Sequence, residues 1–160
     1  MSLNELPPAQ RFMYEYGCFA AFWSNFDLMM EVAICDLSGR QAMENCRQVN
    51  PLTAGRKRQM LTDLLNARNE AAKLAALNKV FDVAERNNWI HGHILNPNGD
   101  FSKLTRLRVT INGASMTVSN FEISQNVSPF ADFYTEWGEI ESVFGLSKNR
   151  CNQYITDIQR

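Results

Sequence analysis

The sequence lacks the signatures from which an enzyme class is often assigned. It contains no Gly-rich phosphate loop, no Ser-His-Asp set and no clustered metal ligands. Its four cysteines form no CxxC pair, so their spacing does not indicate a zinc site. We therefore expect no metal and no organic cofactor. Reduced thiols of a cytosolic protein are the simplest account of the cysteines.

A strong net charge is also absent. The formal net charge of −1 gives no global attraction to nucleic acid, so contact with RNA would have to come from a local patch. The longest apolar stretch, Cys18 to Leu37, is interrupted by Asp27 and Glu31 and does not indicate a membrane span. Residues 1–5 lack the basic start and apolar run of a signal peptide. We expect a cytoplasmic protein without membrane association.

What is present is the composition of a folded domain. The 160 residues are 45% hydrophobic and 21% charged, and no repeat, linker or low-complexity run divides them. We predict a single domain over residues 1–160, with a flexible tail at residues 1–8. The predicted fold class is all-α, an up-and-down helical bundle with a β-hairpin inserted before the last helix.

The longest predicted helix begins near Ala9 and ends at Ser38-Gly39. Its apolar residues recur in alternating steps of four and three, the spacing of a heptad stripe. The stripe contains Phe12, Tyr16, Phe19, Trp23, Phe26, Met30, Ala33 and Leu37. Phe22 and Met29 lie beside it, so this helix offers apolar surface for an internal core and for a partner subunit.

Two shorter helical patterns follow. Residues 40–50 carry a weak one, and Thr53 is placed to cap a second that runs to about Ala67. The first turns of this second helix contain the basic run Arg56–Arg58. The run is either a solvated face or a phosphate-binding patch.

Residues 105–119 change to an alternating pattern around Asn112-Gly113, a strong hairpin signal. A two-residue turn predicts a register in which three apolar pairs share one face. The pairs are Leu107 with Val118, Val109 with Met116, and Ile111 with Ala114. Arg106, Arg108 and Lys103 either extend an RNA-binding surface or form the ordinary polar outer face of the hairpin.

The last helical pattern is predicted to begin at Ser128-Pro129, because serine caps helices and proline suits the first helical position. Its stripe contains Phe130, Phe133, Trp137, Ile140, Phe144, Cys151, Tyr154 and Ile158. Gly145 interrupts the stripe. Either one helix bends at this glycine or a new helix starts at Ser147.

The most informative segment lies at the end of the helix that Asn69 is predicted to open. The stripe of this helix is Leu74, Leu77, Phe81, Ala84, Asn88 and His91. Its last two members are polar where the spacing calls for apolar side chains, and such a break in a regular pattern often marks function. Gly92 follows at a position suited to end the helix. The chain's two histidines, His91 and His93, both lie here.

Arg86 and His91 form a pair suited to phosphodiester chemistry. Histidine transfers protons near neutral pH, and arginine offers a planar, permanently charged fork to phosphate oxygens. Arg86 and His91 are five residues apart, which on a helix corresponds to a rotation of about 140° and a rise of ~7.5 Å. The long arginine side chain and a histidine at the helix end can still reach one phosphate. Asp27 and Glu31 lie one turn apart on the first predicted helix. Either both acids face solvent, or Glu31 orients His91 or Arg86.

The segment Arg86-Asn87-x-x-x-His91, followed by Gly92, resembles the HEPN superfamily, whose signature is Arg, four to six residues, then His. The resemblance covers roughly residues 10–93 and the last helix, and implies a HEPN-like helical bundle. It implies a metal-independent endoribonuclease that cleaves RNA by 2′-OH attack, with Arg86 and His91 as the catalytic pair supported by Asn87. It also implies a homodimer with a composite site, and a toxin or defence role with a possible cognate antitoxin protein.

One position departs from a subgroup of this superfamily. Toxins of that subgroup carry a tyrosine two residues after the histidine as the site of nucleotide transfer, whereas this chain has His93 there. Control through that modification is therefore not expected. The chain also has a second Arg-Asn pair, Arg68-Asn69, but Lys73 stands in the place of the histidine.

A non-catalytic interpretation of the same residues stays open. The helix dipole favours a histidine at a helix C-terminus, and Arg86 has Asp82 and Glu85 as possible ion-pair partners on its own helix. The protein would then be a helical interaction module that dimerises or binds a partner protein.

Overall fold

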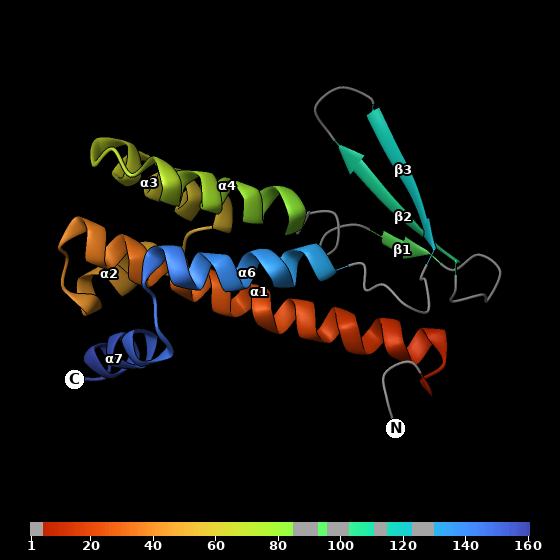
Figure 1. The fold of residues 1–160 in the computed structure, drawn as a ribbon, viewed down its shortest axis with the longest axis horizontal. Helices are drawn as coiled ribbons and strands as arrows, with labels where there is room; N and C mark the ends of the chain where they lie inside the picture. The colour runs from red at the N-terminus through yellow and green to blue at the C-terminus, as the bar shows by residue number, and fades with distance from the viewer. Residues whose placement is uncertain (1–4, 85–92, 96–102, 111–114, 123–129) are drawn as a thin grey trace. The chain divides into compact units, whose positions relative to one another are not determined.

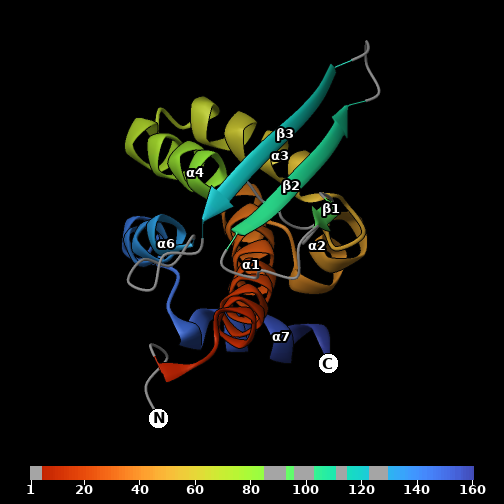
Figure 2. The same cartoon turned by 90° about the vertical axis from the view of Figure 1, so that its right-hand side faces the viewer.

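The computed structural model describes residues 5–84, 93–95, 103–110, 115–122 and 130–160. Contacts divide the chain into two compact units. The sheet unit comprises Met1–Phe22 and Val83–Phe133, and the bundle unit comprises Trp23–Asp82 and Tyr134–Arg160. Figures 1 and 2 show that helices make up most of the described chain.

Helix α1 spans Pro8–Ser38 and contributes to both units (Figure 1). Most of its predicted apolar stripe is buried, and Tyr16 and Leu37 are half-buried. The buried members are Phe12, Phe19, Trp23, Phe26, Met30 and Ala33. Met29 is buried as well, whereas Phe22 is exposed. The stripe is therefore internal core, and Phe22 is the flanking apolar residue that remains at the surface.

Helix α1 is long and apolar enough to cross a membrane when judged by length and composition alone. However, 56% of its most apolar window is buried inside the protein. Such burial is compatible with the core helix of a soluble protein.

Three of the described helices end at a residue with a positive φ, in the left-handed backbone conformation. Gly39 has φ +69 and donates its N–H to the Cys35 carbonyl at 3.0 Å, which ends α1 at the predicted place. Asn69 has φ +58, and the N–H of Glu70 bonds to the Leu65 carbonyl at 3.0 Å, a Schellman motif that closes the preceding helix. The prediction that Asn69 opens a helix was therefore wrong.

The short helices of the bundle unit follow the predicted pattern. Helix α2 spans Ala42–Val49, α3 spans Ala54–Ala67 and α4 spans Ala71–Ala84. The Thr53 side chain accepts the Arg56 N–H at 3.4 Å, so its predicted capping role is confirmed.

The last helical pattern forms two helices. Helix α6 spans Ala131–Phe144 and α7 spans Lys148–Ile158. Gly145, at φ +64, ends α6 in a second Schellman motif, with the Leu146 N–H bonded to the Glu141 carbonyl at 3.2 Å. Ser147 then accepts the Arg150 N–H at 3.2 Å and caps α7. Of the two possibilities at Gly145, the new helix at Ser147 is confirmed, while Ser128-Pro129 lies outside the described residues.

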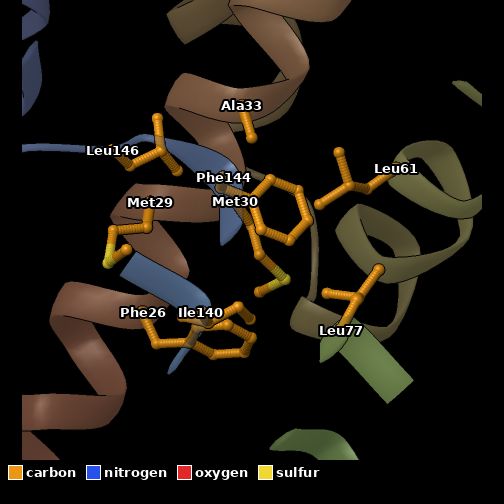
Figure 3. A pocket seen from close by; sticks show the side chains of 9 residues that line it. All are labelled: Phe26, Met29, Met30, Ala33, Leu61, Leu77, Ile140, Phe144 and Leu146. Atoms are coloured by element: carbon orange, nitrogen blue, oxygen red, sulfur yellow. The ribbon is translucent and has the colours of Figure 1, made fainter. Parts of the chain in front are cut away.

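The core of the bundle unit is apolar and closely packed. Phe26 contacts Phe81 and Trp137 with ring centroids 5.6 and 6.1 Å apart. Beside Phe26 a small cavity of about 10 Å³ leaves room for roughly one water molecule (Figure 3). Its lining comes from α1, α3, α4, α6 and the segment after α6: Phe26, Met29, Met30, Ala33, Leu61, Leu77, Ile140, Phe144 and Leu146. The cavity is too small and too apolar to be a substrate site.

The sheet unit has an aromatic core of its own. Phe19 stacks on Phe130 with ring centroids 4.6 Å apart and meets the edge of Phe133 at 5.0 Å. A buried ion pair joins Arg11 to Glu15 at 3.2 Å on the first turns of α1. The first half of α1 and the start of α6 are therefore held together by aromatic packing.

The strands of this unit form one antiparallel sheet in the order β1-β2-β3 (Figures 1 and 2). Strand β1 spans His93–Leu95, β2 spans Lys103–Thr110 and β3 spans Ser115–Glu122. Leu107 pairs with Val118 and Val109 with Met116, which are two of the three pairs predicted from the sequence. The third pair and its Asn112-Gly113 turn lie outside the described residues. Strand β1 was not predicted.

Candidate functional site

The predicted catalytic residues Arg86, Asn87 and His91 lie outside the described residues. In the sequence, this segment is flanked by α4, which ends at Ala84, and by β1, which begins at His93. Ala84 is buried at the end of α4. The pair of Arg86 and His91, and the acids predicted to compete for Arg86, therefore stay predictions.

Helix α4, which leads to this segment, is anchored to its neighbours. The ring of Phe81 meets Trp23 and Phe26 at centroid distances of 5.6 Å each. The Arg58 guanidinium lies 4.6 Å from the centre of the same ring, and its Nη2 donates to the Asn78 Oδ1 at 2.8 Å. Helices α3 and α4 are thus held side by side (Figures 1 and 2).

An ion pair ties α4 to α6. The Lys79 Nζ lies 2.5 Å from the Glu136 Oε1 and 3.9 Å from the Glu139 Oε2. The hydrogen bond to Glu136 raises the pKa of Lys79. Helix α4, which precedes the motif in the sequence, is therefore anchored by contacts to α1, α3 and α6.

The predicted RNA-binding residues Arg106, Arg108 and Lys103 all belong to β2. The pairing with β3 places Lys103 opposite Glu122, Arg106 opposite Ser119 and Arg108 opposite Thr117. Positions 106 and 108 fall on one face of the strand and position 103 on the other, because successive residues alternate in a strand. The three positions therefore do not all share one face of β2, and whether these residues bind RNA stays a prediction.

The described residues contain one large buried polar cluster, the Lys57–Glu31 network. Lys57 on α3 is 0% exposed and Glu31 on α1 is 1% exposed. The Lys57 Nζ donates to the Glu31 Oε2 at 3.3 Å and to the Asp27 Oδ2 at 2.6 Å. The other oxygen of the Glu31 carboxylate accepts the Tyr154 hydroxyl at 2.9 Å. Three helices, α1, α3 and α7, meet at this carboxylate.

Two asparagines complete the network from the α2 region. The Asn45 Nδ2 donates to the Glu31 carbonyl and to the Tyr154 hydroxyl, each at 3.0 Å. The Asn50 Nδ2 donates to the Glu31 Oε2 at 3.2 Å. The main function of such a closed network is structural, because its central ammonium and carboxylate are out of reach of a substrate.

This network overturns two predictions. Lys57 belongs neither to a solvated face nor to a phosphate-binding patch, since two carboxylates surround its buried ammonium. Glu31 does not face solvent as half of an acid pair, although the Asp27 side chain is 33% exposed. The other prediction for Glu31, that it orients Arg86 or His91, stays untested because both of these residues lie outside the described part of the chain.

Asn45 was not predicted as part of a site, and Tyr154 was predicted only as a member of an apolar stripe. Both are 0% exposed and bonded to the network. A signal for Lys57 was present, because it precedes Leu61 and Leu65 by four and eight residues and so lies on their buried face. No comparable local signal marks Asn45.

Burial shifts the titration of the groups around the network. Desolvation raises the pKa of Tyr154 well above its ordinary value, and the hydrogen bond to Glu31 adds to the rise. Desolvation is also the first cause of the raised pKa of Cys46, which hydrogen-bonds Glu31, and of Cys35 and Cys151. All four cysteines are free thiols. The raised pKa makes the thiols of Cys35, Cys46 and Cys151 less reactive.

These shifts predict a loss of stability at alkaline pH. A tyrosine or cysteine with a raised pKa in the folded state loses its proton first in the unfolded state, so the unfolded state is stabilised as the pH rises. The free energy of unfolding should not depend on these groups below pH 9.0, the ordinary pKa of a thiol. It should fall above that pH, and more steeply above pH 10.0, the ordinary pKa of tyrosine. Urea unfolding from pH 7 to 11 measures this.

The Tyr154→Phe variant serves as its control. It should be less stable at neutral pH, since the hydrogen bond to Glu31 is lost, but its unfolding free energy should fall less steeply above pH 10.0. Equal slopes for the variant and the wild type above that pH would rule out Tyr154 as a source of the effect.

Within the described residues, no group of three or more His, Cys, Asp or Glu side chains is arranged to hold a metal ion. Comparison with known proteins gives no further guide, since no family model, no curated protein and no solved structure matches this chain. Any functional proposal therefore rests on the chain's own residues.

Proposed function

We propose that this protein is a metal-independent endoribonuclease of the HEPN type. The observation that carries the proposal is the motif Arg86-Asn87-x-x-x-His91-Gly92, which directly follows the anchored helix α4 in a mainly helical chain. The fold would be a HEPN-like bundle in which the strands are an insertion before the last helices. The protein would be cytoplasmic and homodimeric, with the motifs of two copies forming one RNA-cleaving cleft.

The chemistry assigns one role to each residue. His91 acts as the general base that takes the proton from the 2′-hydroxyl, and the 2′-oxygen then attacks the adjacent phosphorus. The bond from phosphorus to the 5′-oxygen breaks, and this oxygen leaves as a hydroxyl by taking a proton from water. Arg86 stabilises the charge that develops on the phosphoryl oxygens, and Asn87 supports the pair. The products are a 2′,3′-cyclic phosphate and a 5′-hydroxyl end.

The biological setting follows from the resemblance alone. Proteins with this motif commonly act as toxins or defence nucleases, so a cognate antitoxin protein is the expected regulatory partner. His93 stands where one toxin subgroup carries its modified tyrosine, so regulation would use protein binding rather than nucleotide transfer to that position.

A second candidate function, a helical interaction module, is favoured by the surface of α1. Met13 and Tyr14 are 63% and 54% exposed, although they are large and mainly apolar. Gly17 lies about one turn further along the same helix, and a Cβ at this glycine would meet nothing within 4 Å. Neighbouring exposed apolar groups on one helix are common at protein-binding surfaces. A module of this kind would bind a partner without cleaving RNA.

The nature of the cleavage products separates the two functions. Purified protein incubated with single-stranded RNA in excess EDTA should release fragments that end in a 2′,3′-cyclic phosphate or in its hydrolysed form. The expected result follows because no step requires a metal ion. Fragments should be analysed by mass spectrometry. RNA left intact, or cleavage that EDTA abolishes, would contradict the proposed enzyme and favour the interaction module.

A further inference from the structure

The charges of the sheet are unevenly distributed between its two faces. Strands β1, β2 and β3 contain three cations, Lys103, Arg106 and Arg108, but a single carboxylate, Glu122. The register pairs Lys103 directly with Glu122. Opposite charges at directly paired positions attract each other, so the net charge of this pair is zero. The unbalanced positive charge of the strands belongs to the two arginines.

Both arginines lie at positions of the same sheet face. They are two residues apart in β2, and residues at this spacing share a face. Their partners in β3 are Ser119 for Arg106 and Thr117 for Arg108. The next pair on this face is Thr110 with Ser115. Over the described strands, the positions of this face hold two cations, four hydroxyl residues and no acid, together with the apolar residues Ile94, Leu104 and Phe121.

The same face lies next to the strand that continues from the motif. Ile94 of β1 pairs with Arg106 of β2, and His93 pairs with Leu107. His93 is two residues after His91 in the sequence. The pairing thus places the position of Arg106 beside β1, which follows the proposed catalytic segment in the sequence.

We infer that this arginine face, defined by Arg106, Arg108, Ser119 and Thr117, binds the phosphate backbone of the RNA strand on which the nuclease acts. The inference rests on the proposed function for the identity of its ligand. Guanidinium groups bind phosphate oxygens in a bidentate manner, and hydroxyl groups add donors to the same oxygens. The ligand is single-stranded RNA, contacted through its backbone and therefore without sequence preference from this face. Lys103, paired with Glu122 on the other face, takes no part.

The test compares single cation removals in one strand. Arg106→Gln, Arg108→Gln and Lys103→Gln each remove one positive charge from β2, so Lys103→Gln is the matched control. The probe is a fluorescent single-stranded RNA with 2′-O-methyl riboses, which lacks the attacking hydroxyl and cannot be cleaved by 2′-OH attack. Binding to full-length protein is measured by anisotropy from 50 to 200 mM salt.

Each arginine variant should bind more weakly, and the plot of log affinity against log salt should be less steep by about 0.7 for each lost phosphate contact. Lys103→Gln should leave that slope unchanged. The double variant Arg106→Lys with Arg108→Lys should retain the wild-type salt slope, because it keeps both positive charges. This variant controls for loss of folding in the glutamine variants. Wild-type binding by both arginine variants would overturn the inference, and so would an equal loss in all three variants.

The outcome is separable from that of the proposed function. If the protein cleaves RNA but the arginine variants bind the probe as the wild type does, the nuclease stands and the arginine face is wrong. If the arginine variants lose binding but the wild type cleaves no RNA, the face binds RNA and the nuclease is wrong.

Discussion

The Lys57→Met variant should unfold with a free energy lower than that of the wild type by about 3–5 kcal/mol, the usual cost of removing one partner from a buried ion pair. Methionine matches the length and apolar character of the lysine side chain, so packing changes little. What changes is that the Glu31 carboxylate, 1% exposed, loses the ammonium at 3.3 Å while its own charge stays buried. Chemical denaturation at pH 7 measures the difference.

The neighbouring arginine provides the control. Arg56 is exposed one position before Lys57 on α3, so Arg56→Met should change stability by no more than about 0.5 kcal/mol. Combining Lys57→Met with Glu31→Gln should cost less than the sum of the two single changes, because the uncompensated carboxylate is then gone. A Lys57→Met variant as stable as Arg56→Met would mean that the network contributes little to stability.

Much of the helical structure could be predicted because it is encoded by neighbouring residues. The apolar stripe of α1 marked its buried face, and Thr53 and Gly39 marked a helix start and a helix end by their local chemistry. Two pairs of the β2–β3 register followed from the alternating pattern together with the expected two-residue turn. Each of these features depends on residues close together in the sequence.

The polar network could not be predicted in the same way. The Tyr154 hydroxyl and the Glu31 carboxylate that accepts it are 123 residues apart in sequence. The spacing of Lys57 from Leu61 and Leu65 indicates its buried face, but which carboxylates neutralise its charge depends on which helices pack against α3, and no local pattern contains that information. Strand β1 was missed for a related reason, because three residues are too few to show alternation. The pairing of Lys103 with Glu122 likewise needed the register beyond the predicted hairpin.

The His91→Ala variant should cleave RNA about 10²–10⁴-fold more slowly than the wild type, the usual contribution of a general acid or base. The loss should appear in the rate constant of the chemical step, since alanine removes the proton acceptor without removing the phosphate contacts assigned to Arg86. The matched control is His93→Ala, which removes the other histidine of the chain from the start of β1.

The most direct test of the central claim is the single-turnover rate of RNA cleavage in EDTA, measured side by side for the wild type, His91→Ala and His93→Ala. The expected result is a large loss for His91→Ala and a rate within a few-fold of wild type for His93→Ala. Circular dichroism should show that all three proteins are folded. Equal cleavage by the wild type and His91→Ala would contradict the assignment of this motif as the active site.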